Sequence, residues 1–191
     1  MMLEMSGIQK SFGPVQVLKN MQLRILPGEI HALVGENGAG KSTLMKILGG
    51  VIPKDAGEIY IDGKPVEINK VRDAEKIGIA IIHQELSIIP DMTIAENIFL
   101  GNELKTSLGL VDEKRMNQQV EEVLSKLGLT INPKERCRNL GVGQLQLVEI
   151  AKALIHKAQL IVMDEPTSAL TDHEIERLFG IIRSLKKEGV S

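Results

Sequence analysis

The sequence has little of what several classes of protein need. Its 191 residues include a single cysteine, and aromatic residues make up 2% of the chain, with three Phe, one Tyr and no Trp. One cysteine, Cys137, excludes an intrachain disulfide and favours a reducing compartment. The scarcity of aromatic side chains argues against a base-stacking surface for single-stranded nucleic acid and against an aromatic-lined sugar cleft.

Long apolar runs and a strong net charge are also missing. No run approaches the roughly 20 apolar residues that cross a bilayer, and the N-terminus lacks the basic and apolar regions of a signal peptide. The 23 Lys and Arg residues nearly balance the 25 Asp and Glu residues, giving a net charge of −2. We therefore expect no nucleic acid partner and no acidic membrane surface as a ligand. The four histidines lie far apart, so no zinc-type spacing is present.

What is present is the balance of a soluble globular protein. Hydrophobic residues make up 43% of the chain and charged residues 25%. That composition excludes wholesale disorder, and the length suits one α/β domain with or without a small inserted lobe.

Strand patterns dominate the first third and return near the end. Residues 15–25 are largely apolar and end at a Leu-Pro-Gly turn, and residues 29–34 read as a strand that runs into glycine. Residues 57–61 alternate and meet Asp62-Gly63, a strong hairpin signal. Residues 160–163 form an unbroken apolar run that suits a buried parallel strand.

Helical patterns fill the middle, from about residue 86 to 157. One helix is expected between Asp112 as its N-cap and Gly128 as its stop, and a second helix follows around residues 148–155. A last helix is expected after residue 170. Its inward face is predicted to hold Ile175, Leu178, Phe179 and Ile182.

These elements predict an α/β fold: a mixed β-sheet with crossover helices, interrupted by a mostly helical insertion. Residues 1–85 would form the N-terminal part of the core, residues 86–157 the helical subdomain, and residues 158–191 the C-terminal part of the core.

A phosphate-binding loop is the clearest chemical motif. Residues 35–42, Gly-Glu-Asn-Gly-Ala-Gly-Lys-Ser, match G-x-x-x-x-G-K-[ST] at every fixed position. Glycines let the backbone turn its N–H groups toward phosphate oxygens, and the following helix presents its N-terminus to the anion. Lys41 would supply a cation to the β- and γ-phosphates, and Ser42 a hydroxyl to Mg²⁺. The motif predicts a nucleoside triphosphate ligand.

Two carboxylates end the apolar strand at residues 160–163. Asp164 is placed like a residue that holds Mg²⁺ through water, and Glu165 like a base that polarises the attacking water. A phosphate loop and an acidic strand end in one chain together favour nucleoside triphosphate hydrolysis.

The combination resembles the nucleotide-binding domain of an ATP-binding cassette (ABC) transporter, a P-loop NTPase. Residues 35–43 resemble its Walker A motif, residues 160–165 its Walker B motif and residues 166–170 its D-loop. Gln84 resembles the Q-loop glutamine, and residues 140–144, Leu-Gly-Val-Gly-Gln, resemble the signature motif. The order and spacing agree over nearly the whole chain.

Three further segments of the sequence narrow the resemblance. Residues 83–86, 96–101 and 143–154 are similar to the ATPase subunits of bacterial monosaccharide importers, which carry two cassettes in tandem, and this chain resembles the first. The resemblance implies ATP and Mg²⁺ as ligands, a second nucleotide-binding domain bound head to tail, and transmembrane permease subunits. It also implies a separate sugar-binding protein and a place on the cytoplasmic face of the bacterial cell membrane.

The resemblance assigns roles to named residues. Glu165, Lys41 and Gln84 would be catalytic, and Ser42, Gln84 and Asp164 would hold Mg²⁺. Ile88, Ile89 and Met92, in the loop after Gln84, would contact the membrane partner. The nucleotide would be bound by Phe12, which stacks on adenine, by Gly35, Glu36, Asn37, Gly38, Ala39, Gly40, Lys41, Ser42 and Thr43, and, from the opposite cassette, by Gly141, Val142, Gly143 and Gln144.

The sequence departs from the family pattern in two places. Gly141 stands where serine is usual, so a hydroxyl that bonds the γ-phosphate of the opposite site is missing, and we suspect one handicapped composite site. The family has a further strand that ends in a switch histidine, and this sequence stops before it. We expect a truncated cassette that binds Mg-ATP and hydrolyses it slowly or not at all by itself.

Three alternatives remain open. A GTPase would need an Asn-Lys-x-Asp guanine reader, and the nearest match has Arg72 in place of the Asp. An ABC-type ATPase that acts on nucleic acid or ribosomes is disfavoured by the neutral charge and the scarce aromatics. A non-hydrolysing ATP-binding scaffold is the third.

Overall fold

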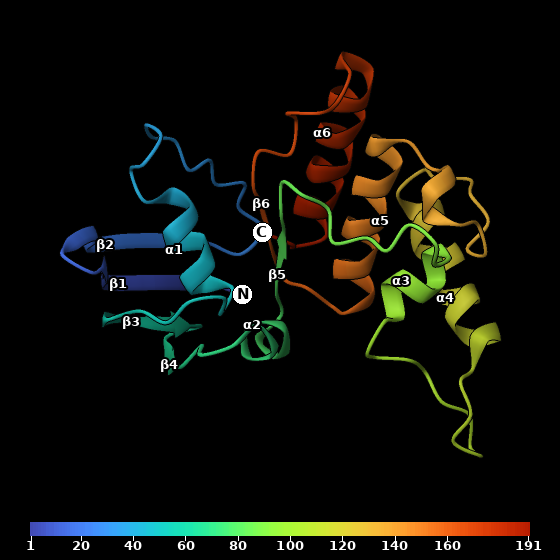
Figure 1. The fold of residues 1–191 in the computed structure, drawn as a ribbon, viewed down its shortest axis with the longest axis horizontal. Helices are drawn as coiled ribbons and strands as arrows, with labels where there is room; N and C mark the ends of the chain where they lie inside the picture. Colours follow the sequence, from blue (N-terminus) through green and yellow to red (C-terminus); the bar gives the residue numbers. More distant parts are fainter. The chain divides into compact units, whose positions relative to one another are not determined.

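A computed structural model describes residues 1–191, which form two compact units (Figure 1). The first unit holds residues 1–81, 158–164 and 182–191, and the second holds residues 82–157 and 165–181. The elements in chain order are β1 (Leu3–Phe12), β2 (Val15–Ile25), α1 (Lys41–Leu48), β3 (Ala56–Ile61), β4 (Lys64–Val66), α2 (Val71–Ile77), β5 (Ile79–Ile82), α3 (Ile94–Phe99), α4 (Glu113–Lys126), the 3₁₀ turn η1 (Cys137–Asn139), α5 (Val142–Ile155), β6 (Leu160–Met163) and α6 (Asp172–Lys187).

The first unit contains a four-stranded antiparallel sheet in the order β2-β1-β3-β4. Leu3 of β1 lies opposite Ile25 on one side and Ile61 on the other. The hairpin between β3 and β4 turns at Asp62 and Gly63, both with positive φ, as this type of two-residue turn requires. The hairpin predicted at these two residues is therefore confirmed.

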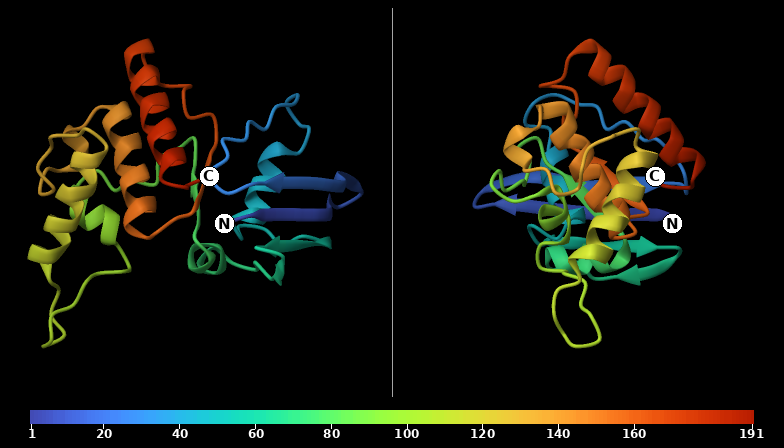
Figure 2. Two further views of the ribbon diagram at one scale, coloured as in Figure 1. Left: turned by 180° about the vertical axis from the view of Figure 1, so that it is seen from behind. Right: turned by 90° about the vertical axis from the view of Figure 1, so that its right-hand side faces the viewer.

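Helix α1 covers one face of this sheet (Figure 2). Leu44, Ile47 and Leu48 are its buried residues, because they recur at the spacing of one helix face. They pack in one core with side chains from the strands, and full burial of each such side chain contributes about 2 kcal/mol to stability. The members of this core from the four-stranded sheet are Leu3, Met5, Ile8, Leu18, Leu23, Ile25 and Ile59, and Ile79 of β5 and Leu160 of β6 belong to the same core.

A second sheet pairs β5 with β6. The carbonyl of Gly78, just before β5, accepts hydrogen bonds from the backbone N–H groups of Gln159 and Leu160, at the start of β6. The two strands therefore begin side by side and run in the same direction. On the other side of β6, Ser191 donates to Gln159 O at 2.9 Å and accepts from Ile161 N at 2.8 Å.

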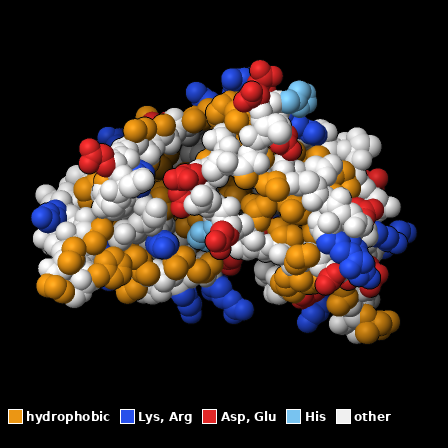
Figure 3. Space-filling view, turned by 45° about the horizontal axis from the view of Figure 1, so that its top comes forward, with side chains coloured by type: hydrophobic (Ala, Val, Ile, Leu, Met, Phe, Trp, Pro, Cys, Tyr) orange, Lys and Arg blue, Asp and Glu red, His pale blue; other side chains and the backbone are white.

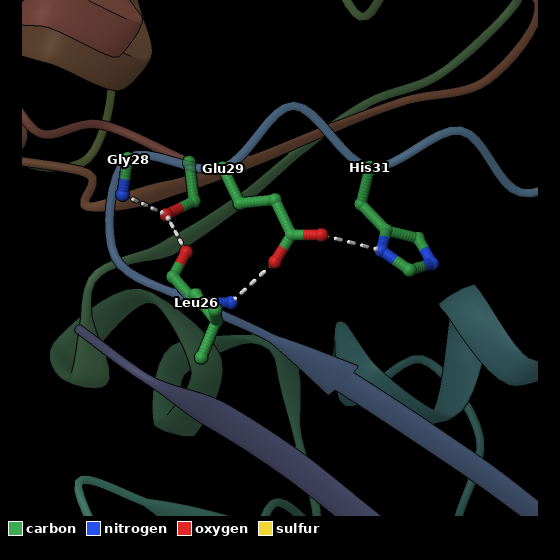
Figure 4. A network of polar contacts seen from close by, with 5 residues as sticks. Leu26, Gly28, Glu29 and His31 are labelled. Carbon is green, nitrogen blue, oxygen red and sulfur yellow. Dashed lines mark hydrogen bonds and ion pairs between the residues drawn. The ribbon is translucent and has the colours of Figure 1, made fainter.

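A polar network ties the last residue to the turn after β2 (Figure 4). Ser191 Oγ accepts from Gly28 N at 2.9 Å and donates to Leu26 O at 3.1 Å. Glu29 accepts from Leu26 N at 2.7 Å and contacts the ring of His31 at 3.1 Å. The Leu26 hydrogen bond is the main reason that the pKa of Glu29 lies below its ordinary value.

The strand predicted over residues 29–34 is wrong. The segment has no regular structure, and its apolar side chains are exposed, Val34 by 89%. A strand needs a neighbour to satisfy its backbone N–H and carbonyl groups, and no segment of the chain pairs with residues 30–35. An apolar segment bounded by glycine and proline therefore did not by itself produce a strand here.

The second unit contains α3, α4 and α5, which pack against one another (Figure 2). Helix α4 begins where Asp112 accepts a hydrogen bond from Arg115 N at 3.0 Å, and Gly128 follows its end with a positive φ. Both predicted boundaries of this helix are confirmed, since a capping carboxylate and a left-handed glycine act locally.

Helix α6 begins in the second unit and ends in the first. Leu178 is buried as predicted, whereas Phe179 is 43% exposed, so its predicted inward position is wrong. Ile181 and Leu185 are buried instead. Both follow Leu178 at the i, i+3, i+7 spacing of a single helix face, which turns Phe179 outward.

The α/β fold class is confirmed, with the strands divided between two sheets rather than joined in one. No helix combines the length and the apolar character that a membrane span requires.

Candidate functional site: the phosphate loop and the signature helix

The phosphate loop leads directly into α1 in the first unit. The first intrahelical hydrogen bond of α1 runs from Leu44 N to Gly40 O at 2.9 Å. The N–H groups of Lys41, Ser42 and Thr43 consequently have no acceptor within the chain. Three free N–H groups at a helix N-terminus form an anion-binding end that suits phosphate oxygens.

Lys41 places its ammonium group against the loop. Its Nζ donates to the carbonyl oxygens of Gly35 at 2.6 Å and Glu36 at 2.9 Å. A backbone hydrogen bond from Ala39 N to Glu36 O closes the loop from within at 3.1 Å. The structure thus brings the predicted phosphate-binding residues 35–43 together around one cation and one helix end.

Gly40 is required at the start of α1. Its φ is 95°, in the left-handed region, and a Cβ there would lie 2.6 Å from Leu18 Cδ2. A larger residue would push the loop away from the core, because Leu18 is fully buried. This glycine fixes how the loop enters the helix.

Asp164 and Glu165 follow the end of β6. Asp164 is half-buried in the first unit, while Glu165 is exposed and belongs to the second unit. Glu165 has a φ of 45°, a left-handed conformation that costs a side-chain-bearing residue about 1 kcal/mol. Strain of this kind is found at functional sites.

Gln84 lies two residues after β5 and is exposed. The chain that follows it is held by Asn97 of α3, which is 2% exposed. The Asn97 amide accepts from Ile89 N at 2.8 Å and donates to Ile89 O at 3.0 Å and Thr93 O at 3.1 Å. The segment after Gln84 is therefore fixed to α3 through one side chain.

The residues of the signature motif form the start of α5 in the second unit. Gly141 is the N-cap and has no side chain to accept from the first turn. Its own N–H donates to Gln144 Oε1 at 3.0 Å, and Val142 is 49% exposed. Gly143 is buried against the side chain of Glu174. Residues 141–144 thus sit together at one helix N-terminus.

Phe12 ends β1 with its ring 49% exposed. The ammonium of Lys10 lies 5.7 Å from the centroid of that ring. The nitrogen of Lys10 is paired with Asp55 at 2.7 Å, and this hydrogen bond is the main cause of the lowered pKa of Asp55. The exposed ring of Phe12 therefore lies at the end of β1, near the ammonium of Lys10.

Sequence reasoning missed three residues with placed polar side chains. Glu174 had a readable signal, since Thr171 and Glu174 have the spacing of a capping box. Asn97 and Glu149 had none, because each is a polar residue on the buried face of a helix whose pattern marks that face as apolar. Burial raises the pKa of Glu149, and its Oε1 has no hydrogen-bond partner.

Charge on the protein surface is mixed. On the face shown in Figure 3, acidic and basic side chains are interspersed with apolar ones. This agrees with the near-neutral net charge of the sequence.

The residues fit ATP and magnesium by their chemistry. The free N–H groups at Lys41, Ser42 and Thr43 and the ammonium of Lys41 suit a polyphosphate. The hydroxyl of Ser42 and the carboxylate of Asp164, both in the first unit, are the oxygen ligands that Mg²⁺ prefers. The remaining predicted residues, Gln84, Glu165 and 141–144, belong to the second unit.

Comparison with known proteins agrees with this geometry. The chain is 54% identical, over its whole length, to the ribose import ATP-binding protein RbsA of Shouchella clausii, and 52% identical over 99% of its length to that of Caldanaerobacter subterraneus. It spans 38% of the length of each of these relatives.

Solved structures agree as well. An ATP-binding cassette of an ABC transporter in its ADP conformation superposes with a TM-score of 0.86 at 26% identity, covering 99% of this chain and 78% of that one. A nucleotide-free ATP-binding cassette gives a TM-score of 0.87 at 26% identity, with the same coverage. Residues 18–168 match the ABC transporter family. With the phosphate loop, the acidic strand end and the signature helix placed as described, the chain belongs to the ABC transporter family.

Proposed function

We propose that this chain is the first ATP-binding cassette of an importer subunit, which binds and hydrolyses ATP to drive monosaccharide uptake through a separate permease. The observation that carries the proposal is the phosphate loop, where three unpartnered N–H groups and the Lys41 ammonium surround one helix end. The relatives named above are ribose import proteins, which supports a pentose as the class of cargo.

The chain's own residues would divide the work. The first turn of α1 and Lys41 bind the β- and γ-phosphates and offset charge as it develops on the transferred group. Ser42, Asp164 and Gln84 would hold Mg²⁺, which supplies further charge neutralisation when bound. Glu165 orients the attacking water and takes up its proton.

Assembly follows from the same residues. A second cassette, bound head to tail, would present the start of its α5 helix to the γ-phosphate, so that ATP completes the interface and hydrolysis releases it. The half-exposed Ile88, Ile89 and Met92, in the segment after Gln84, would meet the permease on the cytoplasmic face of the bacterial membrane. A separate binding protein would select the sugar, and no nucleic acid takes part.

The test is nucleotide binding. Isothermal titration with Mg-ATP should give saturable binding to the wild-type chain and no measurable binding to Lys41→Ala. Lys46→Ala is the matched control, because Lys46 lies in the same helix with its side chain exposed. Unchanged affinity in Lys41→Ala, or a preference for GTP over ATP, would overturn the proposal.

A further inference from the structure

A side chain from outside α5 lies against the first turn of α5. An ordinary helix start carries Ser, Thr, Asp or Asn at the N-cap, whose side-chain oxygen accepts from the N–H two or three residues on. Gly141 occupies this position and offers no such oxygen. The first intrahelical bond runs from Leu145 N to Gly141 O at 3.0 Å, so the N–H groups of Val142, Gly143 and Gln144 lack helical partners.

The carboxylate of Glu174 lies against this turn. A Cβ at Gly143 would overlap Glu174 Oε1 and would lie 2.7 Å from its Cδ, so the carboxyl group rests directly on the Gly143 backbone. The Gly143 N–H contributes to the lowered pKa of Glu174, after the hydrogen bonds from Thr171 and the effect of His173. The group that approaches the Gly143 backbone is thus the anionic end of a side chain from α6.

The same carboxylate caps α6. Glu174 Oε2 accepts from Thr171 N at 2.9 Å and from Thr171 Oγ1 at 2.8 Å. One negative group therefore stands at the positive ends of two helices, α5 and α6, and each helix dipole stabilises it. A second contact joins the same segments, because Gln146 Nε2 of α5 donates to Pro166 O at 2.7 Å.

We propose that Glu174 is a positioning residue, which replaces the N-cap hydroxyl that Gly141 lacks and sets the first turn of α5 against residues 166–174. This inference rests on the proposed function in one respect: the first turn of α5 is the part that a second cassette's ATP would meet. Glu174 would then act through Gly143, by fixing the direction of the remaining free N–H groups.

A direct structural test needs no nucleotide. Amide-resolved hydrogen exchange should be faster at Gly143 in Glu174→Ala than in the wild-type chain, by about tenfold. Glu176→Gln, an exposed acid on the same helix, should leave the rate at Gly143 unchanged. If Glu174→Ala does not fold, Glu174→Gln takes its place, with a smaller effect of the same sign. Equal exchange rates at Gly143 in the wild type and in the Glu174 variant would overturn the inference.

A kinetic test separates positioning from a loss of folded protein. In the full-length protein assembled with its permease, Glu174→Ala should lower kcat about tenfold and leave the KM for ATP within twofold, because the phosphate loop is untouched. A rise in kcat would overturn the inference, since the carboxylate would then oppose closure. An absence of ATP turnover in the wild type would instead count against the proposed function, and the exchange experiment would still decide the role of Glu174.

A rescue experiment with Gly141→Ser tests the proposed role of Glu174 most directly. Gly141→Ser restores an N-cap hydroxyl, so Glu174→Ala should cost less in that background than in the wild type. A fall in kcat of about tenfold in the wild type and about twofold in Gly141→Ser would support the replacement of one acceptor by the other. An equal cost in both backgrounds would overturn it.

Discussion

Asn97 and Ile89 exchange two hydrogen bonds, one from Ile89 N to Asn97 Oδ1 at 2.8 Å and one from Asn97 Nδ2 to Ile89 O at 3.0 Å. The side-chain amide thus pairs with a backbone as a neighbouring strand would. The backbone N–H and carbonyl at residue 89 would otherwise stand in a segment without regular structure. The segment that begins at Gln84 is consequently anchored rather than loose.

Replacing Asn97 should loosen this segment. Asn97→Ala leaves the Ile89 N–H without a partner inside the fold, while the Ile89 carbonyl keeps its hydrogen bond from Met92 N at 3.2 Å, so the free energy of unfolding should fall by about 1–3 kcal/mol. Chemical denaturation measures the loss. Asn102→Ala, an exposed asparagine just beyond α3 with no side-chain hydrogen bond, should stay within about 0.5 kcal/mol of the wild type. Equal effects of the two variants would contradict the anchoring role.

Glu149 should make the protein less stable as pH rises. Burial raises its pKa above the ordinary 4.5, and the charges of Lys152 and His83 and the Ser87 N–H lower it only in part. The folded protein therefore disfavours the charged form, and stability that is present below pH 4.5 is lost as pH rises through the raised pKa. Glu149→Gln removes the titration, so its stability relative to the wild type should grow as pH rises above 4.5.

A control with the opposite sign is available in Glu96. The backbone and side chain of Thr93 lower the pKa of Glu96, so its stabilising effect is present above pH 4.5 and lost as pH falls through the lowered value. In urea unfolding, the stability of Glu96→Gln relative to the wild type should fall as pH rises toward 4.5, whereas that of Glu149→Gln should grow as pH rises above 4.5. Parallel curves would show that the buried carboxyl of Glu149 does not titrate as described.

Local chemistry explains which parts of the fold the sequence predicted. Asp62-Gly63, the Asp112 cap and the phosphate loop each depend on a few adjacent residues, so their patterns are complete in the sequence. The strand expected over residues 29–34 was wrong because strand pairing depends on a neighbour that the local sequence and its flanking glycine and proline cannot reveal. Phe179 was misplaced because the buried face of α6 runs through Leu178, Ile181 and Leu185, and the apolar pattern of the sequence did not single out this face.

The residues of the candidate site likewise fall into those that the sequence predicted and those that it did not. The glycines and Lys41 were readable because they belong to one contiguous motif, residues 35–42. Asn97 and Glu174 act across gaps in the sequence, on Ile89 and Gly143, and their partners became visible only once the helices were packed. Buried polar residues of this kind satisfy backbone groups, and no periodicity marks them.

Phe12 should contribute to nucleotide affinity and little to stability. Its ring is 49% exposed, so Phe12→Ala removes an accessible face rather than a core contact. If that face stacks on adenine, affinity for Mg-ATP should fall about tenfold, and Phe12→Trp should retain it. Val15→Ala, at the residue paired with Phe12 in the hairpin, controls for damage to the turn. Titration of a fluorescent ATP analogue measures all three variants.

Replacing Glu165 with glutamine should abolish ATP hydrolysis and leave ATP binding intact. Glu165→Gln removes the base and keeps the shape, so turnover by the assembled protein should fall at least about a hundredfold while Mg-ATP affinity stays within twofold. Glu165→Gly should also stop turnover, yet it should raise the free energy of unfolding by about 1 kcal/mol, because glycine adopts the φ of 45° without strain. Phosphate release and thermal unfolding, measured on the same samples, distinguish the two effects. Normal turnover in Glu165→Gln would assign the base to another residue, and a destabilised Glu165→Gly would show that the backbone at this position is not strained.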